Sequence, residues 1–169
     1  GLLAEAGLPD GAFNLVTGLG PEAGAALVAN EGVDKISFTG STVVGMGIAR
    51  VAADRVARVG LELGGKSAAI IRDDFPIEAA AQILGNTITV LSGQVCAMLT
   101  RAIVPRARHD ELAEAIAGVM KQVKVGHSRD EGVQLGPLAM KRQLERVEMY
   151  IAEGRRTADL VTGGQRPAH

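Results

Sequence analysis

Cys96 is the only cysteine among the 169 residues, and it follows the polar segment Ser92-Gly93-Gln94-Val95. A cysteine in such a segment can act as a nucleophile when its surroundings stabilise the thiolate. A single free cysteine is also commonly a small buried hydrophobic residue, so both interpretations stay open. One cysteine excludes an intramolecular disulfide and a multi-cysteine zinc site, and the three histidines lack metal-ligand spacing, so we expect no metal.

Glu62 lies in a segment whose apolar residues alternate with other types. If this segment is a strand, Val59, Leu61 and Leu63 face one side, and Glu62 faces the other side between two glycines. Neighbouring glycines leave a carboxylate open to a ligand, and apolar surroundings would suit a general base. The alternative interpretation is an ordinary exposed glutamate at the end of a strand.

Two glycine-containing segments precede predicted helices and could bind a phosphate through the helix N-terminus. The first, Gly18-Leu19-Gly20-Pro21-Glu22-Ala23, matches the dinucleotide string G-x-G-x-x-G/A, but Pro21 lacks an N–H donor and Glu22 adds negative charge. We therefore interpret it as a turn and a helix start. The second, residues 38–45, places Ser41 and Thr42 after Gly40, and these hydroxyls could either cap the helix or contact a phosphate.

The elements that must position these residues alternate between strand-length apolar runs and helical patterns, which predicts an α/β fold with mostly parallel strands. The predicted strands cover residues 12–16, 35–39, 57–63, 67–71 and 99–105. The predicted helices begin at residues 21, 42 and 77, and two more carry apolar faces formed by Leu112, Ile116, Val119, Met120 and Val123, and by Leu144, Val147 and Ile151. We expect both faces to belong to the core. The glycine pair at residues 64 and 65 is the predicted domain crossing.

Composition narrows the range of partners. Eighteen basic and nineteen acidic side chains leave a net charge of -1, and aromatic residues make up only 2%, so nucleic acid is not expected. Residues 79–100 carry no charge, a length that raises the question of a membrane span of about 20 residues. Polar residues such as Gln82, Asn86 and Gln94 would need partners inside lipid, so we expect a buried soluble segment and no membrane association. The single cysteine fits a reducing compartment, so we expect a cytoplasmic location.

Three strings, in this order and at these separations, resemble motifs of the aldehyde dehydrogenase superfamily: Phe38-Thr39-Gly40-Ser41-Thr42, Leu61-Glu62-Leu63-Gly64-Gly65-Lys66 and Gly93-Gln94-Val95-Cys96. Residues 6–16, 134–138 and 161–164 also resemble stretches of that family, so the resemblance covers essentially the whole chain. It implies a modified Rossmann-type parallel sheet followed by part of a second α/β catalytic domain. Residues 1–64 would be the C-terminal part of an NAD(P)-binding domain, and residues 65–169 the N-terminal part of a catalytic thiol domain.

The resemblance also implies roles for individual residues. Cys96 would attack an aldehyde to form a thiohemiacetal, hydride would pass to NAD or NADP, and Glu62 would activate water to hydrolyse the resulting thioester. Ser41 and Gly40 would contact the cofactor pyrophosphate, and the other implied cofactor-binding residues are Gly18, Val44, Leu63 and Gly64. The product would be a carboxylic acid.

One departure from the family pattern is Leu91, which stands where the family usually has asparagine. The chain would be an internal fragment of an enzyme that forms a homodimer or homotetramer, and the fragment alone is predicted to be inactive. Two alternatives stay open: a non-catalytic protein of the same fold with a binding or structural role, and a semialdehyde dehydrogenase that passes the acyl group to coenzyme A. Glu62 favours hydrolysis, because acyl transfer to a thiol needs no base that activates water.

Overall fold

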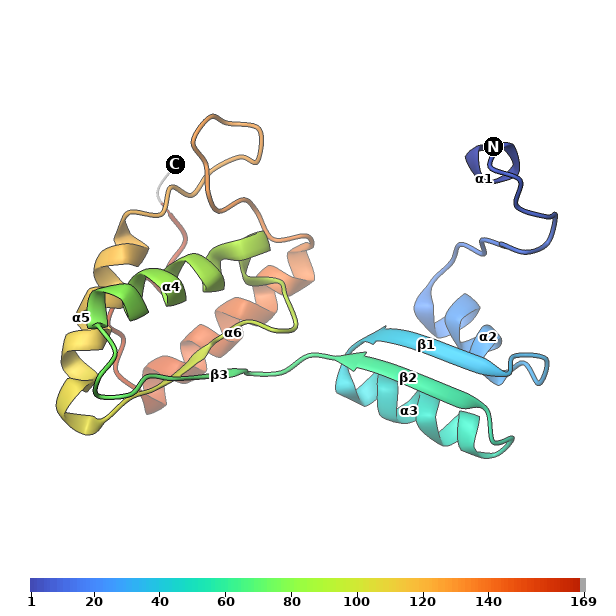
Figure 1. The fold of residues 1–169 in the computed structure, drawn as a ribbon, viewed down its shortest axis with the longest axis horizontal. Coiled ribbons are helices and arrows are strands. Elements are labelled where there is room, and N and C mark those ends of the chain that lie inside the picture. The colour runs from blue at the N-terminus through green and yellow to red at the C-terminus, as the bar shows by residue number, and fades with distance from the viewer. Residues whose placement is uncertain (168–169) are drawn as a thin grey trace. The chain divides into compact units, whose positions relative to one another are not determined.

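The computed structural model describes residues 1–167, and these form two compact units whose boundary in the chain lies between Leu63 and Gly64 (Figure 1). Both units contain helices and parallel strands. The predicted α/β class is therefore confirmed.

Unit 1 is built around two parallel strands, β1 (Lys35–Gly40) and β2 (Arg58–Leu63), joined by helix α3 (Thr42–Ala53). Along β2, exposed residues alternate with half-buried ones, as predicted. The α3 helix packs on the half-buried side, because a Cβ built on Gly45 would lie only 2.8 Å from Leu63 Cδ2. This packing leaves the Glu62 side of β2 exposed.

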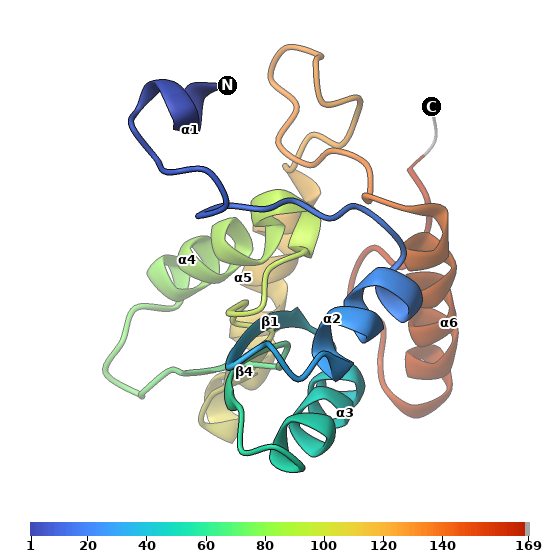
Figure 2. The same ribbon diagram turned by 90° about the vertical axis from the view of Figure 1, so that its right-hand side faces the viewer.

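The first 34 residues contain little regular structure apart from short helices. These are α1 (Leu2–Glu5), a π-helical turn over Gly20–Gly24 and α2 (Ala25–Ala29). The Arg55 guanidinium donates a hydrogen bond of 2.8 Å to the Val28 carbonyl, and Figure 2 shows α2 beside α3. The strand predicted for residues 12–16 is wrong, because this segment has no β partner among residues 1–167 and a strand needs a neighbour for its backbone hydrogen bonds.

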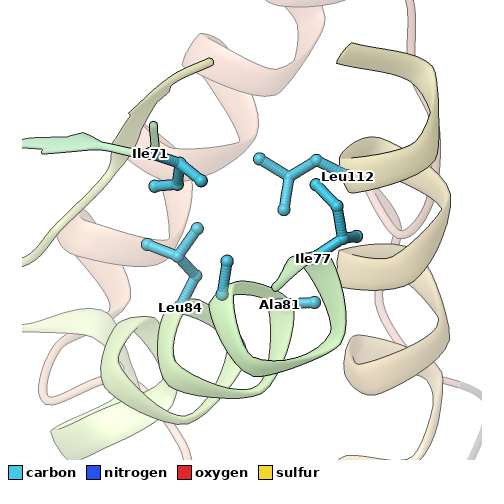
Figure 3. Close-up of a cluster of buried hydrophobic side chains, with 6 residues drawn as sticks. Ile71, Ile77, Ala81, Leu84 and Leu112 are labelled. Atoms are coloured by element: carbon cyan, nitrogen blue, oxygen red, sulfur yellow. The ribbon is translucent and has the colours of Figure 1, made fainter. Parts of the chain in front are cut away.

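Unit 2 contains the short parallel strands β3 (Ala68–Ile70) and β4 (Arg101–Ile103) and the adjacent helices α4 (Ile77–Thr89) and α5 (His109–Lys121). Its core consists of Ile71, Ile77, Ala80, Ala81, Leu84 and Leu112. Figure 3 shows that Ile77 and Leu84 of α4 point toward Leu112 of α5 and toward Ile71. The predicted core face of α5 is confirmed, since Ile116 and Val119 pack against this cluster.

Helix α6 (Lys141–Thr157) differs from the prediction. None of its residues is buried, so assigning Leu144, Val147 and Ile151 to the core is wrong for the described chain. The spacing predicted the helix correctly, but burial requires an opposing apolar surface as well as an apolar face. Arg166 donates a hydrogen bond of 2.5 Å to Glu148 of α6, and this bond holds the pKa of the Glu148 carboxyl below its ordinary value.

The uncharged run from residue 79 to residue 100 does not form one long helix. Helix α4 ends at Thr89, and a 3₁₀ turn (Val90–Gly93), a loop and the start of β4 follow. Within residues 1–167, no helix is both long and apolar enough to cross a bilayer.

Candidate active site

Cys96 is exposed in a turn of unit 2, between the 3₁₀ turn that follows α4 and the strand β4. Two residues later, Met98 is 4% exposed and anchors the chain on the way to β4. Cys96 is therefore exposed in the described chain, and it is not the small buried hydrophobic residue of the alternative interpretation.

The backbone that leads from α4 to Cys96 has an unusual conformation. Leu91, Ser92 and Gly93 all have positive φ angles, of 49°, 57° and 75°. Glycine adopts this left-handed conformation without penalty, whereas a side chain such as that of leucine is strained there. Strained backbone persists only where surrounding contacts hold it, and it is frequently found at functional sites.

The contacts that hold this turn come from the segment 136–139. Ser92 Oγ donates a hydrogen bond of 2.9 Å to the Gly136 carbonyl. The Gln94 side chain donates through Nε2 to the Leu91 carbonyl at 3.2 Å and accepts at Oε1 from the Ala139 N–H at 3.1 Å. Sequence reasoning missed these roles, although the family resemblance had marked both segments that meet here.

Glu62 lies in unit 1, on the exposed face of β2 opposite α3. Its register partner in β1 is Thr39, so its carboxylate belongs to the carboxyl ends of the two parallel strands. Ligands of α/β proteins bind at such ends. The apolar surroundings expected for Glu62 are not found within unit 1, where this residue is exposed.

The N-terminus of α3 follows directly after the end of β1. Ser41 caps the helix by accepting a 3.4 Å hydrogen bond from the Val44 N–H, and the first turn contains no acidic residue. The first N–H groups of a helix have no acceptor within the helix, and Thr42, Val43 and Val44 are exposed here. Gly40 is required for close packing, because a Cβ at this position would lie 2.4 Å from Phe38 Cζ.

The remaining predicted cofactor-binding residues are Gly18, Leu63 and Gly64, and they differ in the space that surrounds them. Gly18 lies just before the π-helical turn, and a Cβ there would meet Ala23 Cβ at 2.8 Å. Leu63 ends β2 with its side chain against α3, so only its backbone is left for a ligand. A Cβ built on Gly64 would meet no atom within 4 Å. Unit 1 therefore brings Glu62, Gly40 and Ser41 to one end of its strand pair, while Cys96 belongs to unit 2.

A model of the aldehyde dehydrogenase family matches residues 1–169, the whole of the sequence. The chain belongs to the aldehyde dehydrogenase family. It spans about a third of the length of the curated aldehyde dehydrogenases that it matches. One of them, the hydroxyisobutyraldehyde dehydrogenase of Mycolicibacterium austroafricanum, is 42% identical over 166 residues, which cover 98% of this chain and 33% of that protein.

Solved aldehyde dehydrogenase structures match the fold as well as the sequence. A mutant of the Bacillus cereus enzyme has a TM-score of 0.94 and 40% identity, with 99% of this chain and 34% of the other covered. A mutant of aldehyde dehydrogenase C from Pseudomonas syringae, in complex with NAD+ and octanal, also has a TM-score of 0.94 and 40% identity, covering 99% and 35% of the two chains. Aldehyde dehydrogenases similar to this chain thus bind NAD+.

Proposed function

We propose that the protein carrying this chain oxidises an aldehyde to a carboxylic acid and passes the hydride to NAD or NADP. In this proposal unit 1 belongs to the cofactor domain and unit 2 to the thiol domain. The observation that carries the proposal is the exposed Cys96 on a tied, left-handed turn, in a chain that matches the family throughout.

The residues of unit 1 fit a dinucleotide. The N-terminus of α3 is exposed and lacks acidic residues, so its free N–H groups and the Ser41 hydroxyl suit a pyrophosphate. Gly40 lies directly before Ser41 at the end of β1, and Val44 lies in the first turn of α3. The π-helical turn after Gly18 suits a phosphate less well, because it carries Pro21 and Glu22 in its first turn.

The mechanism begins with attack of the Cys96 thiolate on the aldehyde carbonyl carbon. A C–S bond forms, the carbonyl π bond breaks, and the Cys96 backbone N–H helps to stabilise the oxyanion of the thiohemiacetal. The dinucleotide, when bound, supplies the hydride acceptor. When the thiohemiacetal carbon gives up its hydride, a thioester remains on Cys96.

Glu62 then takes a proton from water as the water oxygen attacks the thioester carbonyl. The C–S bond breaks, the carboxylic acid leaves, and Cys96 returns as a thiolate. Glu62 is the reason for preferring hydrolysis to acyl transfer to coenzyme A, since a thiol acceptor needs no base acting on water.

The test is substitution of the two residues in the complete protein. Cys96→Ala should lower kcat by about 10⁴-fold or more, because it removes the nucleophile. Glu62→Gln should lower steady-state acid production by about 10²–10⁴-fold while a burst of NADH and an acyl-enzyme detectable by mass spectrometry persist. The matched control is Glu114→Gln, an exposed glutamate of α5, which should behave as the wild type.

Turnover retained by Cys96→Ala would overturn the proposal. Activity that depends on coenzyme A in place of water would support the acyl-transfer alternative. A wild-type protein whose Cys96 is alkylated by iodoacetamide no faster than free cysteine at neutral pH, and which oxidises no aldehyde, would be a non-catalytic member of the family.

A further inference from the structure

We propose that Gln94 is a positioning residue for Cys96. In this inference its side-chain amide, together with Ser92, ties the left-handed turn to the segment 136–139 and thereby sets the place of the thiol. We call the four residues Leu91, Ser92, Gly93 and Gln94, with these hydrogen bonds, the 91–94 clamp. The predicted loss of kcat rests on the proposed function, whereas the predicted change in Cys96 alkylation does not.

The backbone from Leu91 to Gly93 needs contacts outside the turn to keep its conformation. Three consecutive residues in the left-handed region form a conformation that the chain between α4 and β4 would not keep unaided, since two of the three are not glycine. Something outside the turn must therefore hold it. The long-range hydrogen bonds from Ser92 to Gly136 and from Ala139 to Gln94 do so, across 44 and 45 positions of sequence.

The side-chain amide of Gln94 offers both a donor and an acceptor. Gln94 donates to Leu91 within the turn and accepts from Ala139 outside it, so the side chain uses one donor and one acceptor at the same time. A glutamate could accept from the Ala139 N–H but could not donate to the Leu91 carbonyl. A methionine of similar length could do neither. Only an amide makes both side-chain hydrogen bonds, and the Leu91 carbonyl also accepts from the Gln94 backbone N–H at 3.1 Å.

A short stretch of backbone connects the clamp to the Cys96 thiol. Cys96 lies between Gln94, held by the clamp, and Met98, held by burial. Only four peptide bonds separate these two fixed residues, so a shift of Gln94 is passed to the Cys96 sulfur with little slack. A displacement of about 1 Å in a reacting group costs about 10²-fold in rate.

The experiment compares Gln94→Met, Gln94→Glu and Ser92→Ala in the complete protein. The matched control is Gln82→Met, since Gln82 is an exposed glutamine of α4 whose side chain donates a hydrogen bond to its neighbour Asn86 on the same helix. For each variant we would measure the thermal midpoint, kcat per folded molecule, KM for NAD+ and the rate of Cys96 alkylation by iodoacetamide over a range of pH.

We expect Gln94→Met to lower kcat about 10²-fold with KM for NAD+ within about threefold of the wild type. Gln94→Glu should fall between Gln94→Met and the wild type, because it keeps one of the two hydrogen bonds. The pH profile of alkylation should change in Gln94→Met and not in Gln82→Met. In the variant that combines Gln94→Met with Ser92→Ala, the loss should be smaller than the product of the single losses, because both residues hold the same turn.

The inference is overturned if Gln94→Met lowers the thermal midpoint but leaves both kcat per folded molecule and the alkylation profile equal to those of Gln82→Met. That result would give Gln94 a structural role only. If Gln94→Met does not fold, Ser92→Ala and Gln94→Glu decide by the same criteria. If the wild type oxidises no aldehyde, the proposed function fails, and the alkylation profiles alone then judge the clamp.

Discussion

Leu91 adopts a backbone conformation that leucine rarely adopts. Its φ of 49° and ψ of 37° are left-handed, and the residue is 71% exposed, so little burial offsets the strain. Asparagine tolerates this conformation better than other side chains apart from glycine. The departure from the family pattern at this position therefore has a physical cost that the structure makes visible.

We predict that Leu91→Asn stabilises the protein by about 1 kcal/mol, because it lowers the penalty of the left-handed backbone without changing any hydrogen bond of the clamp. Urea denaturation measures the difference. Leu91→Ala is the control, since it removes the leucine side chain and keeps the penalty. Equal stability of the asparagine and alanine variants would contradict this account.

The turn that carries Cys96 depends on how α4 is held. Helices α4 and α5 cross closely at Gly85, where a Cβ would lie 2.4 Å from Val119 Cγ1. The Ile77 and Leu84 side chains then complete the core with Leu112 and Ile71 (Figure 3). Because α4 ends only a few residues before the 91–94 clamp, any shift of this helix reaches the thiol.

We expect Gly85→Ala to destabilise the protein by about 1–3 kcal/mol, since the new methyl group would meet the stiff β-branched side chain of Val119, whose Cβ would itself lie only 3.2 Å away. The control is Gly118→Ala on α5, where a Cβ meets no atom within 4 Å and the better helix propensity should stabilise by about 1 kcal/mol. Chemical denaturation checks both. The account fails if the two variants change the stability in the same direction, or if adding Val119→Ala to Gly85→Ala costs the full sum of the single losses.

Several surfaces of the described chain that other α/β proteins cover are exposed here. Each of its two sheets has only two parallel strands, and parallel sheets in α/β proteins normally have both faces covered. Ile70 of β3 is 74% exposed, and α6 has no buried residue. The chain also spans about a third of the length of its relatives.

We predict that the 169 residues expressed alone do not oxidise aldehydes, whereas the complete protein does. The physical reason is that the exposed faces of β3 and α6 lack the surfaces that would cover them, so we expect the isolated chain to be less stable than the complete protein and to lack part of the site that binds aldehyde and cofactor. NADH formation with a panel of aliphatic aldehydes checks this, with circular dichroism as the control for folding. Turnover by the isolated chain above that of its Cys96→Ala variant would refute the prediction.

Much of the fold followed from local patterns. Alternation over residues 59–64 predicted the two faces of β2, and the helices from residues 42 and 77 begin where expected, because apolar periodicity and the residue types that start a helix are local features of the sequence. The motif strings around Ser41, Glu62 and Cys96 were also sufficient to predict the family. The strand at residues 12–16 and the core face of α6 failed for the opposite reason, since both depend on a partner surface that no local pattern describes.

The hydrogen bonds of the 91–94 clamp could not have been predicted from the amino-acid sequence, because Gln94 and Ala139 are 45 positions apart and no spacing rule joins them. The same holds for the left-handed backbone at Leu91, since leucine carries no preference for that conformation. Residue types and their spacing thus predicted the family, and the family resemblance predicted roles for the thiol, the carboxylate and the glycines. The folded chain was needed to reveal what holds the thiol in place, because that depends on contacts between distant segments.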